Sequence, residues 1–209
     1  GLEAISPEVM EVGVGGPGLG MSESLPFSET DSETAMQIYS SVYDLSELER
    51  RAKLLSESLT EATDSVRNYR ELLESTPSIL PTEGWISSGF SKSRVHPLHH
   101  LPMPHLGIDI SAPAGTPIVA AAKGRVTRSR WVVGYGLTIE IDHGFGFTTL
   151  YSHASELVVQ AGESVTRGQV IAKVGRTGTA TAPNLHYEVK VDGIAQDPYR
   201  FILPNLSQN

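Results

Sequence analysis

Two short apolar segments carry side chains that can bind a metal ion. In the segment 105–110, His105 and Asp109 are four residues apart, so on an extended strand both point to one face and the apolar residues to the other. The segment 184–189 shows the same alternation around His186. We therefore expect each segment to be a strand with a core face and a polar face.

Further polar residues accompany these candidates. Asn184 and Glu188 share the predicted face of His186, and Tyr151 and His153 share a face of a third strand. Two imidazoles and one carboxylate form a known catalytic zinc set that leaves the fourth position for water. Such a set suits a hydrolase, because zinc acidifies water and polarises a carbonyl. On spacing alone, ordinary strand histidines remain the alternative interpretation.

The composition excludes several classes of protein. The chain has 209 residues and 39% hydrophobic residues, enough for one domain with an appendage or for two small domains. It contains no cysteine, so disulfide scaffolds, cysteine nucleophiles and thiolate zinc sites are excluded. No apolar run is long enough to span a bilayer. The net charge of -8 argues against a nucleic-acid partner.

The charge and the histidines divide the chain into two parts. Residues 1–80 hold 15 acidic and 5 basic residues, a net charge of −10; the remaining 9 acidic and 11 basic residues give 81–209 a net charge of +2. All 7 histidines lie at or after His96. The three in the loop before the site, His96, His99 and His100, are expected to be solvated loop residues. The two parts are therefore expected to have different roles.

Residues 1–32 are expected to form a glycine-rich tail, because the stretch around Gly15 favours neither a helix nor a central strand. The tail does not have the pattern of a signal peptide. Since the sequence opens at Gly1 without Met, it is expected to be trimmed, and a secretion signal or membrane anchor could have been removed with the missing part. Contact with a membrane is expected only through such an anchor.

One long helix is predicted over 33–76, a stretch without Gly or Pro that has Asp31 and Ser32 as candidate N-caps and is followed by Pro77. Its seven-residue repeat runs through two series, Ile38, Leu45, Ala52, Leu59, Val66, Leu73 and Ser41, Leu48, Leu55, Ala62, Tyr69. Such a repeat predicts a coiled coil of roughly 60 Å. The helix must bury this seam against a partner, and a homodimer, another helix or the following domain would each serve.

An antiparallel β domain, a sandwich or open barrel, is predicted over 81–209. The expected strands are 118–122, 124–130, 137–142, 148–152, 170–174 and 185–191. A hairpin turn is expected at 142–144, with His143 facing solvent. The fold class is therefore α+β, with the long helix preceding the β domain.

The segment 84–191 resembles the lysostaphin-type (LytM-like) zinc endopeptidases, which cut peptidoglycan cross-links. The matching pieces, in order, are Ser88-Gly89-Phe90, Arg94-Val95-His96-Pro97, His105-x-Gly107-x-Asp109, Ala112 to Ile118, Tyr151-x-His153, Gly162-x-x-Val165-x-x-Gly168-Gln169-x-Ile171, Gly175-x-Thr177-Gly178 and Asn184-Leu185-His186-Tyr187-Glu188-Val189. This resemblance covers just over half of the chain and implies the lysostaphin-type fold.

The resemblance also implies roles for individual residues. His105, Asp109 and His186 correspond to the zinc ligands of the family. His153 and Asn184 stand at the positions of its catalytic histidine pair, so Asn184 departs from the pattern. An amide cannot take up a proton near neutral pH, and general acid–base catalysis contributes about 10²–10⁴-fold.

Taken together, these residues predict a zinc-dependent endopeptidase of peptidoglycan, weakened at Asn184. Its partners would be peptidoglycan stem peptides, and its location the extracytoplasmic envelope of a bacterium. The alternative is a degenerate zinc-binding LytM-like module that binds the wall or regulates other wall hydrolases. A third interpretation is that the asparagine is a deliberate substitution that traps an inactive form. Some relatives cover the zinc with an N-terminal segment, so residues 1–30 could contact the groove here.

Overall fold

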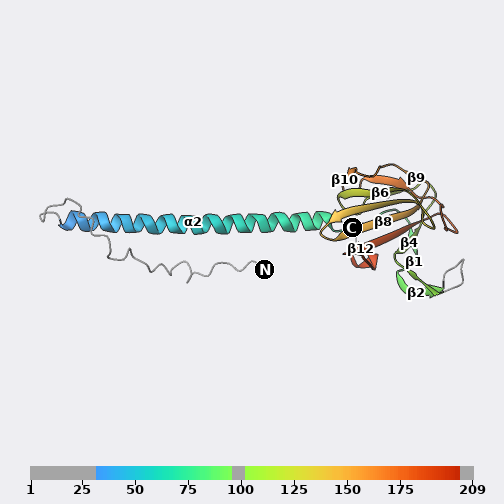
Figure 1. The fold of residues 1–209 in the computed structure, drawn as a ribbon, viewed down its shortest axis with the longest axis horizontal. Helices are drawn as coiled ribbons and strands as arrows, with labels where there is room; N and C mark the ends of the chain where they lie inside the picture. Colours follow the sequence, from blue (N-terminus) through green and yellow to red (C-terminus); the bar gives the residue numbers. More distant parts are fainter. Residues whose placement is uncertain (1–31, 96–101, 203–209) are drawn as a thin grey trace, which may run out of the picture. The chain divides into compact units, whose positions relative to one another are not determined.

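The computed structural model describes residues 32–95 and 102–202 (Figure 1). The predictions for the tail up to Asp31 and for the loop histidines His96, His99 and His100 lie outside the described residues. The chain divides into two compact units, 1–69 and 70–209. We call them the helical unit and the β unit, and we describe each by itself.

Helix α2 spans Ser32–Ser75 and supplies the whole described part of the helical unit. It continues without interruption because the stretch contains neither Gly nor Pro. Apolar residues of the seven-residue repeat are exposed in the single chain; Leu45, Leu59 and Val66 are 58%, 60% and 66% exposed. The predicted helix is thus confirmed, whereas the coiled-coil partner of its seam stays a prediction.

The last turn of α2 belongs to the β unit. Glu74 forms an ion pair with Lys123 at 3.0 Å, and its carbonyl accepts a hydrogen bond from the Lys123 backbone N–H at 3.1 Å. After the helix, Ile79 and Leu80 pack against the core of the unit. Folding of the β unit therefore involves residues that precede its first strand.

An eight-stranded antiparallel sheet organises the β unit. In spatial order it contains β1 (Trp85–Ser88), β4 (Ile108–Ser111), β12 (Asn184–Val191), β8 (Phe147–Ala154), β7 (Gly136–Gly144), β6 (Gly124–Val132) and β10 (Ser164–Val165), and β13 (Ile194–Gln196) pairs with β12. The long central strands β6, β7, β8 and β12 are neighbours in this order, and β6, β8 and β12 run side by side in Figure 1.

Two smaller sheets and one short helix complete the described part of the unit. They are the three-stranded sheet of β5 (Pro117–Val119), β11 (Val170–Lys173) and β9 (Glu156–Leu157), the two-stranded sheet of β2 (Ser91–Val95) and β3 (Pro102–His105), and the 3-10 helix η1 (Pro198–Arg200).

The core of the β unit is built from residues of both larger sheets. Ile110, Ile139 and Tyr187 from the eight-stranded sheet and Ile118 and Ile171 from the three-stranded sheet are fully buried in one cluster. Burying such side chains is the main favourable contribution to folding. The predicted fold class, one helix followed by an antiparallel β domain, is confirmed.

Two local predictions were wrong. The hairpin between β7 and β8 turns at Phe145 and Gly146, whose φ angles are 52° and 80°, and not at 142–144. His143 is therefore inside β7, where it is only 4% exposed and not solvent-facing. Its Nδ1 lies 2.6 Å from the Lys123 carbonyl and its Nε2 lies 2.7 Å from the Thr149 hydroxyl.

Among the described residues, no helix combines the length and hydropathy that crossing a bilayer requires.

Candidate metal centre

His105 and Asp109 meet because the chain bends between them. The sequence suggested one continuous strand, on which their Cα atoms would be about 13 Å apart. Instead β3 ends at His105 and β4 begins at Ile108, which brings His105 Nε2 within 3.1 Å of Asp109 Oδ1. Gly107 permits this bend next to β12, because a Cβ there would lie 2.2 Å from the Tyr187 carbonyl oxygen.

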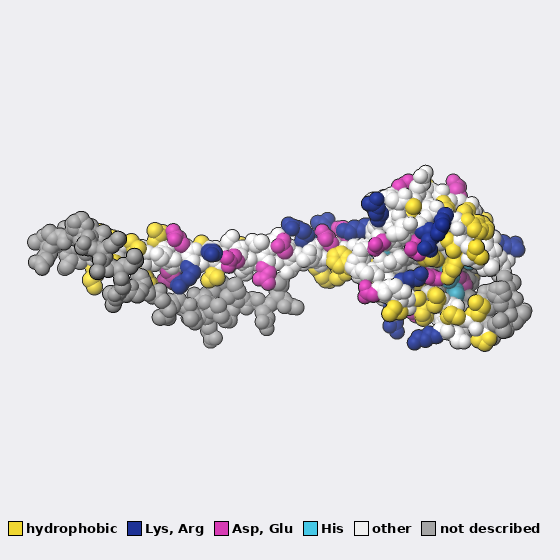
Figure 2. Space-filling model, viewed as in Figure 1, with side chains coloured by type: hydrophobic (Ala, Val, Ile, Leu, Met, Phe, Trp, Pro, Cys, Tyr) yellow, Lys and Arg dark blue, Asp and Glu magenta, His cyan; other side chains and the backbone are white. Residues whose placement is uncertain are grey.

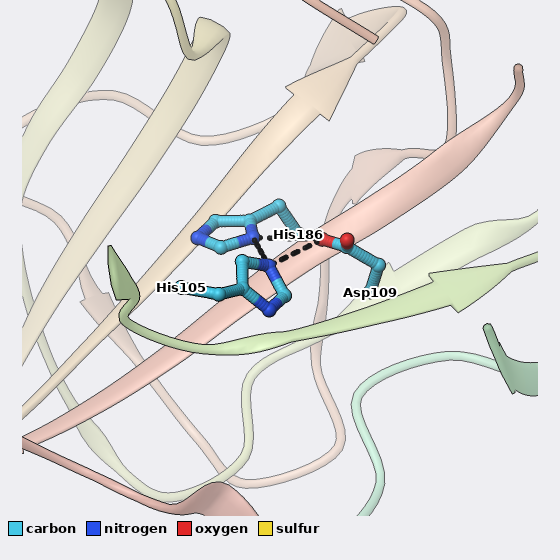
Figure 3. A group of neighbouring side chains, drawn as sticks. All are labelled: His105, Asp109 and His186. Carbon is cyan, nitrogen blue, oxygen red and sulfur yellow. Dashed lines mark hydrogen bonds and ion pairs between the residues drawn. The ribbon is translucent and has the colours of Figure 1, made fainter. Parts of the chain in front are cut away.

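His186 reaches the same point from the adjacent strand. It is the direct cross-strand partner of Asp109 in the β4–β12 ladder, and its Nδ1 lies 2.8 Å from Asp109 Oδ1. The distance between His105 Nε2 and His186 Nδ1 is 3.1 Å (Figure 3). The structure thus brings the three predicted ligands together in one triangle of atoms. Ligand atoms around a tetrahedral zinc are roughly 3.4 Å apart, so a triangle of this size fits the ion.

The outer nitrogens of both rings determine which atoms face the centre of the triangle. His105 Nδ1 lies 2.7 Å from the Gly89 carbonyl, and His186 Nε2 lies 3.1 Å from Glu188 Oε1. A carbonyl and a carboxylate only accept hydrogen bonds, so in the neutral rings these nitrogens carry the protons. The two inner nitrogens and Asp109 Oδ1 then direct lone pairs at one point, and a cation is what satisfies them together.

The electrostatics of the triangle also favour a cation. Burial alone would raise the pKa of Asp109, but hydrogen bonds with His105 and His186 hold it well below its usual range. Burial alone would lower the pKa of His186, but its hydrogen bonds with Asp109 and Glu188 raise it to about 9. Both shifts have the same cause, the attraction between the carboxylates and a positive charge in the triangle, so a metal ion would compete with protons for these atoms.

His153 lies beside the triangle at the end of β8, with its ring centroid 6.0 Å from that of His186. Its backbone N–H donates to the Tyr135 carbonyl at 2.9 Å, and its Nδ1 lies 2.7 Å from the Thr177 carbonyl. Nδ1–H is thus the donor, which leaves Nε2 as a free proton acceptor. Burial lowers the pKa of His153, so the ring is neutral at neutral pH. Its φ of 65° is a strained conformation for a residue with a side chain.

Asn184 begins β12 and lines the same cleft as His153 and the triangle. Its Oδ1 is buried and has no hydrogen-bond partner among the described residues. The cleft has a volume of about 400 Å³, and its walls include apolar residues such as Met103 and Leu106. A histidine side chain is visible between hydrophobic patches of the β unit (Figure 2). The position can offer an amide to a bound molecule but not a base.

Two residues near the site, Tyr135 and Thr177, were not predicted from the sequence to take part in it. Tyr135 lines the cleft, and its hydroxyl donates to Glu188 Oε1 at 3.0 Å. Thr177 was read only as part of a turn motif, yet its carbonyl accepts from His153 and its hydroxyl donates to the Ala154 carbonyl at 2.8 Å. Both residues lie next to glycines in turns, a pattern that indicates loops and carries no sign of a site.

Comparisons with known proteins agree with this geometry. Residues 103–198 match the family model described as Peptidase family M23. The peptidoglycan DD-endopeptidase ShyC of Vibrio cholerae is 40% identical over 119 residues, which are 57% of this chain and 28% of that protein. The crystal structure of a zinc-containing peptidase from Vibrio cholerae has a TM-score of 0.56 at 34% identity, over 62% of this chain and 40% of that chain. The catalytic domain of lysostaphin from Staphylococcus simulans has a TM-score of 0.51 at 30% identity, over 56% of this chain and 91% of that chain.

The fold and the site therefore define a metallopeptidase domain of the lysostaphin (LytM-like) type. The chain belongs to peptidase family M23. It spans only 25% to 30% of the length of the curated relatives compared with it.

Proposed function

We propose that the chain binds one zinc ion through His105 Nε2, Asp109 Oδ1 and His186 Nδ1. The observation that carries this proposal is the triangle of three electron-pair donors whose edges measure 2.8 to 3.1 Å. Two nitrogens and one oxygen are the donor set of catalytic zinc sites that leave a position for water. Asp109 supplies one of the negative charges that a divalent ion requires, and Glu188 supplies another behind His186.

On this basis we propose that the chain hydrolyses peptide bonds. Zinc, when bound, supplies an acidified water and a polarised carbonyl. Of the two catalytic positions, 153 and 184, only His153 carries a base. Its Nε2 can accept a proton because its Nδ1–H donates to the Thr177 carbonyl. Asn184 can hold a substrate or a water by hydrogen bonds but cannot accept the proton. One base in place of two predicts a slower enzyme.

The proposed substrate is the peptide cross-link of bacterial peptidoglycan. The name of the relative from Vibrio cholerae, a peptidoglycan DD-endopeptidase, supports this substrate. The open cleft of about 400 Å³ beside the triangle gives an extended peptide access to the site. The place of action would then be the extracytoplasmic envelope, and stem peptides would be the partners.

A second candidate function follows from Asn184. A chain that keeps the zinc ligands and lacks one catalytic histidine could bind stem peptides, or regulate other wall hydrolases, without cleaving. The two candidates differ in turnover and not in metal content.

For the helical unit we propose association with a second copy of the chain. The exposed apolar residues of its repeat support this proposal, since a helix of this length with an apolar seam is the geometry of a two-stranded coiled coil.

The decisive experiment combines zinc analysis with digestion of purified cell-wall sacculi. Protein purified without chelator is expected to contain about one equivalent of zinc and to release soluble muropeptides. His105→Ala should lose both the zinc and the release. His153→Ala should keep the zinc and lose the release, which separates metal binding from proton transfer. Zinc-loaded wild type that binds sacculi without releasing muropeptides would establish the second candidate, and wild type without zinc would refute both.

A further inference from the structure

Glu188 is a buried carboxylate that the proposed reaction does not use. Its side chain is 1% exposed, and it lies two residues after His186 on the same face of β12. Burying an ionised carboxylate is costly unless partners compensate for the loss of water. Packing alone does not explain a carboxylate at this position, so the partners of Glu188 must be considered.

Three side chains surround this carboxylate. His186 Nε2 lies 3.1 Å from Glu188 Oε1, and the Tyr135 hydroxyl donates to the same oxygen at 3.0 Å. Lys190 Nζ lies 3.3 Å from the other oxygen, Oε2. Both oxygens are thus held, and the carboxylate can rotate only by breaking one of these contacts.

We propose that Glu188 is a positioning residue that fixes the tautomer and the orientation of His186 for metal binding. This inference rests on the proposed zinc site. Glu188 contacts Nε2, whereas the ring atom in the triangle is Nδ1, so the carboxylate acts through the imidazole and is not a fourth ligand. Partners of this kind typically change metal affinity or activity by about 10–100-fold.

Tyr135 extends the same support to the proposed base. Its side chain holds Glu188, and its backbone carbonyl accepts the hydrogen bond of the His153 N–H at 2.9 Å. One residue of the β6–β7 turn therefore sets the positions of a metal ligand and of the proton acceptor. Tyr135 belongs to this positioning network through its hydroxyl and its backbone carbonyl.

Three variants of the full chain test the proposal. Glu188→Met removes the acceptor while keeping a side chain of similar length, and zinc binding measured by chelator competition should weaken by about 10–100-fold. Glu188→Gln keeps an acceptor oxygen for Nε2–H and should recover most of that loss. Glu140→Gln is the matched control, because Glu140 is a partly buried carboxylate on β7 that is paired with Arg128 at 3.2 Å. It should bind zinc as wild type does.

Spectroscopy separates positioning from a general loss of structure. With Co²⁺ in place of zinc, Glu188→Met should shift the ligand-field bands. In the metal-free variant, the ¹⁵N shifts of the His186 ring should report a mixture of tautomers. Tyr135→Phe removes the hydroxyl that donates to Glu188 and should weaken zinc binding by a few-fold, less than Glu188→Met does.

The outcomes also separate this inference from the proposed zinc site. If wild type binds zinc and Glu188→Met binds it equally well with unchanged Co²⁺ bands, the positioning role is refuted and the zinc site stands. If Glu188→Met does not fold, Tyr135→Phe decides, and wild-type zinc affinity and Co²⁺ spectra in that variant would overturn the proposal. Wild type that binds no zinc refutes the proposed function itself.

Discussion

The two units differ in how far they bury their aliphatic side chains. In the β unit, isoleucines such as Ile108, Ile110 and Ile139 are fully buried in one core. In the helical unit, Leu48 and Leu55 are 61% and 53% exposed although they belong to a regular apolar repeat. The β unit thus buries a core within one chain, whereas we proposed that a second copy of the chain covers the seam of the helix.

This difference shows which apolar pattern can be buried within a single chain. A strand with alternating residues finds its neighbours through the ladder, so the side chains on one face come together from distant parts of the chain. A lone helix forms its backbone hydrogen bonds within itself. Its apolar seam is therefore left uncovered unless another element packs against it. We therefore expect changes in the β unit to affect chemistry and changes in the helical unit to affect association.

The largest effect is expected at Asn184, which stands where the resemblance implies a second catalytic histidine. Asn184→His should raise the rate of muropeptide release by about 10²–10⁴-fold, because it adds a second base beside His153. The zinc content should stay unchanged, since Asn184 is not one of the three ligand residues. Rates from zinc-loaded wild type and variant would test this directly. An unchanged rate would mean that proton transfer does not limit this protein.

The next effect is expected in the helical unit. Leu55→Asp places a charge on the seam, and losing a buried leucine contact costs about 2–5 kcal/mol. Association should weaken by about 30-fold or more, as measured by sedimentation equilibrium. Asn68→Asp, which adds the same charge at an exposed position off the seam, is the control. Zinc binding should be the same in both variants. A wild type that is monomeric at all accessible concentrations would contradict the proposed dimer.

A smaller effect is expected at Thr177, whose carbonyl orients the proposed base His153. Thr177→Val removes a hydroxyl that accepts from the Leu137 N–H at 3.0 Å and donates to the Ala154 carbonyl, while it keeps the Thr177 carbonyl that holds His153. The turn should shift slightly, and kcat should fall by about 10-fold because small displacements of a positioned base are costly. Thr179→Val, which loses an exposed hydrogen bond to the Gly134 carbonyl, should change kcat less. Equal effects of the two variants would argue against a specific role of Thr177.

The smallest effect concerns His143. Burial lowers the pKa of this ring below its ordinary value of 6.5, so the unfolded chain binds a proton more readily than the folded one. Its contribution to stability is complete above pH 6.5 and is lost as the pH falls through the lowered pKa. Urea unfolding of metal-free protein between pH 5 and 7 should show a weaker decrease for His143→Gln than for wild type. A decrease of the same slope in both would remove His143 as its source.

The sequence determined the long helix and the long central strands, and their order along the chain. The alternation in 184–189 identified β12 and placed Asn184, His186 and Glu188 on one face, because the side-chain period of a strand is fixed by its backbone. The absence of Gly and Pro over 33–76 identified the long helix for an equally local reason. The candidate ligands came from residue types together with a family resemblance, and the structure brings the three of them together.

Only the tertiary structure decided how these residues act together. The bend between β3 and β4 replaces an expected continuous strand, and β12 passes so close to Gly107 that no side chain fits there. The burial of His143 and the contacts of Tyr135 and Thr177 depend on residues that are 20 to 53 positions away along the chain. Local patterns cannot encode such contacts, because they form only when the strand order of the sheet brings distant segments side by side.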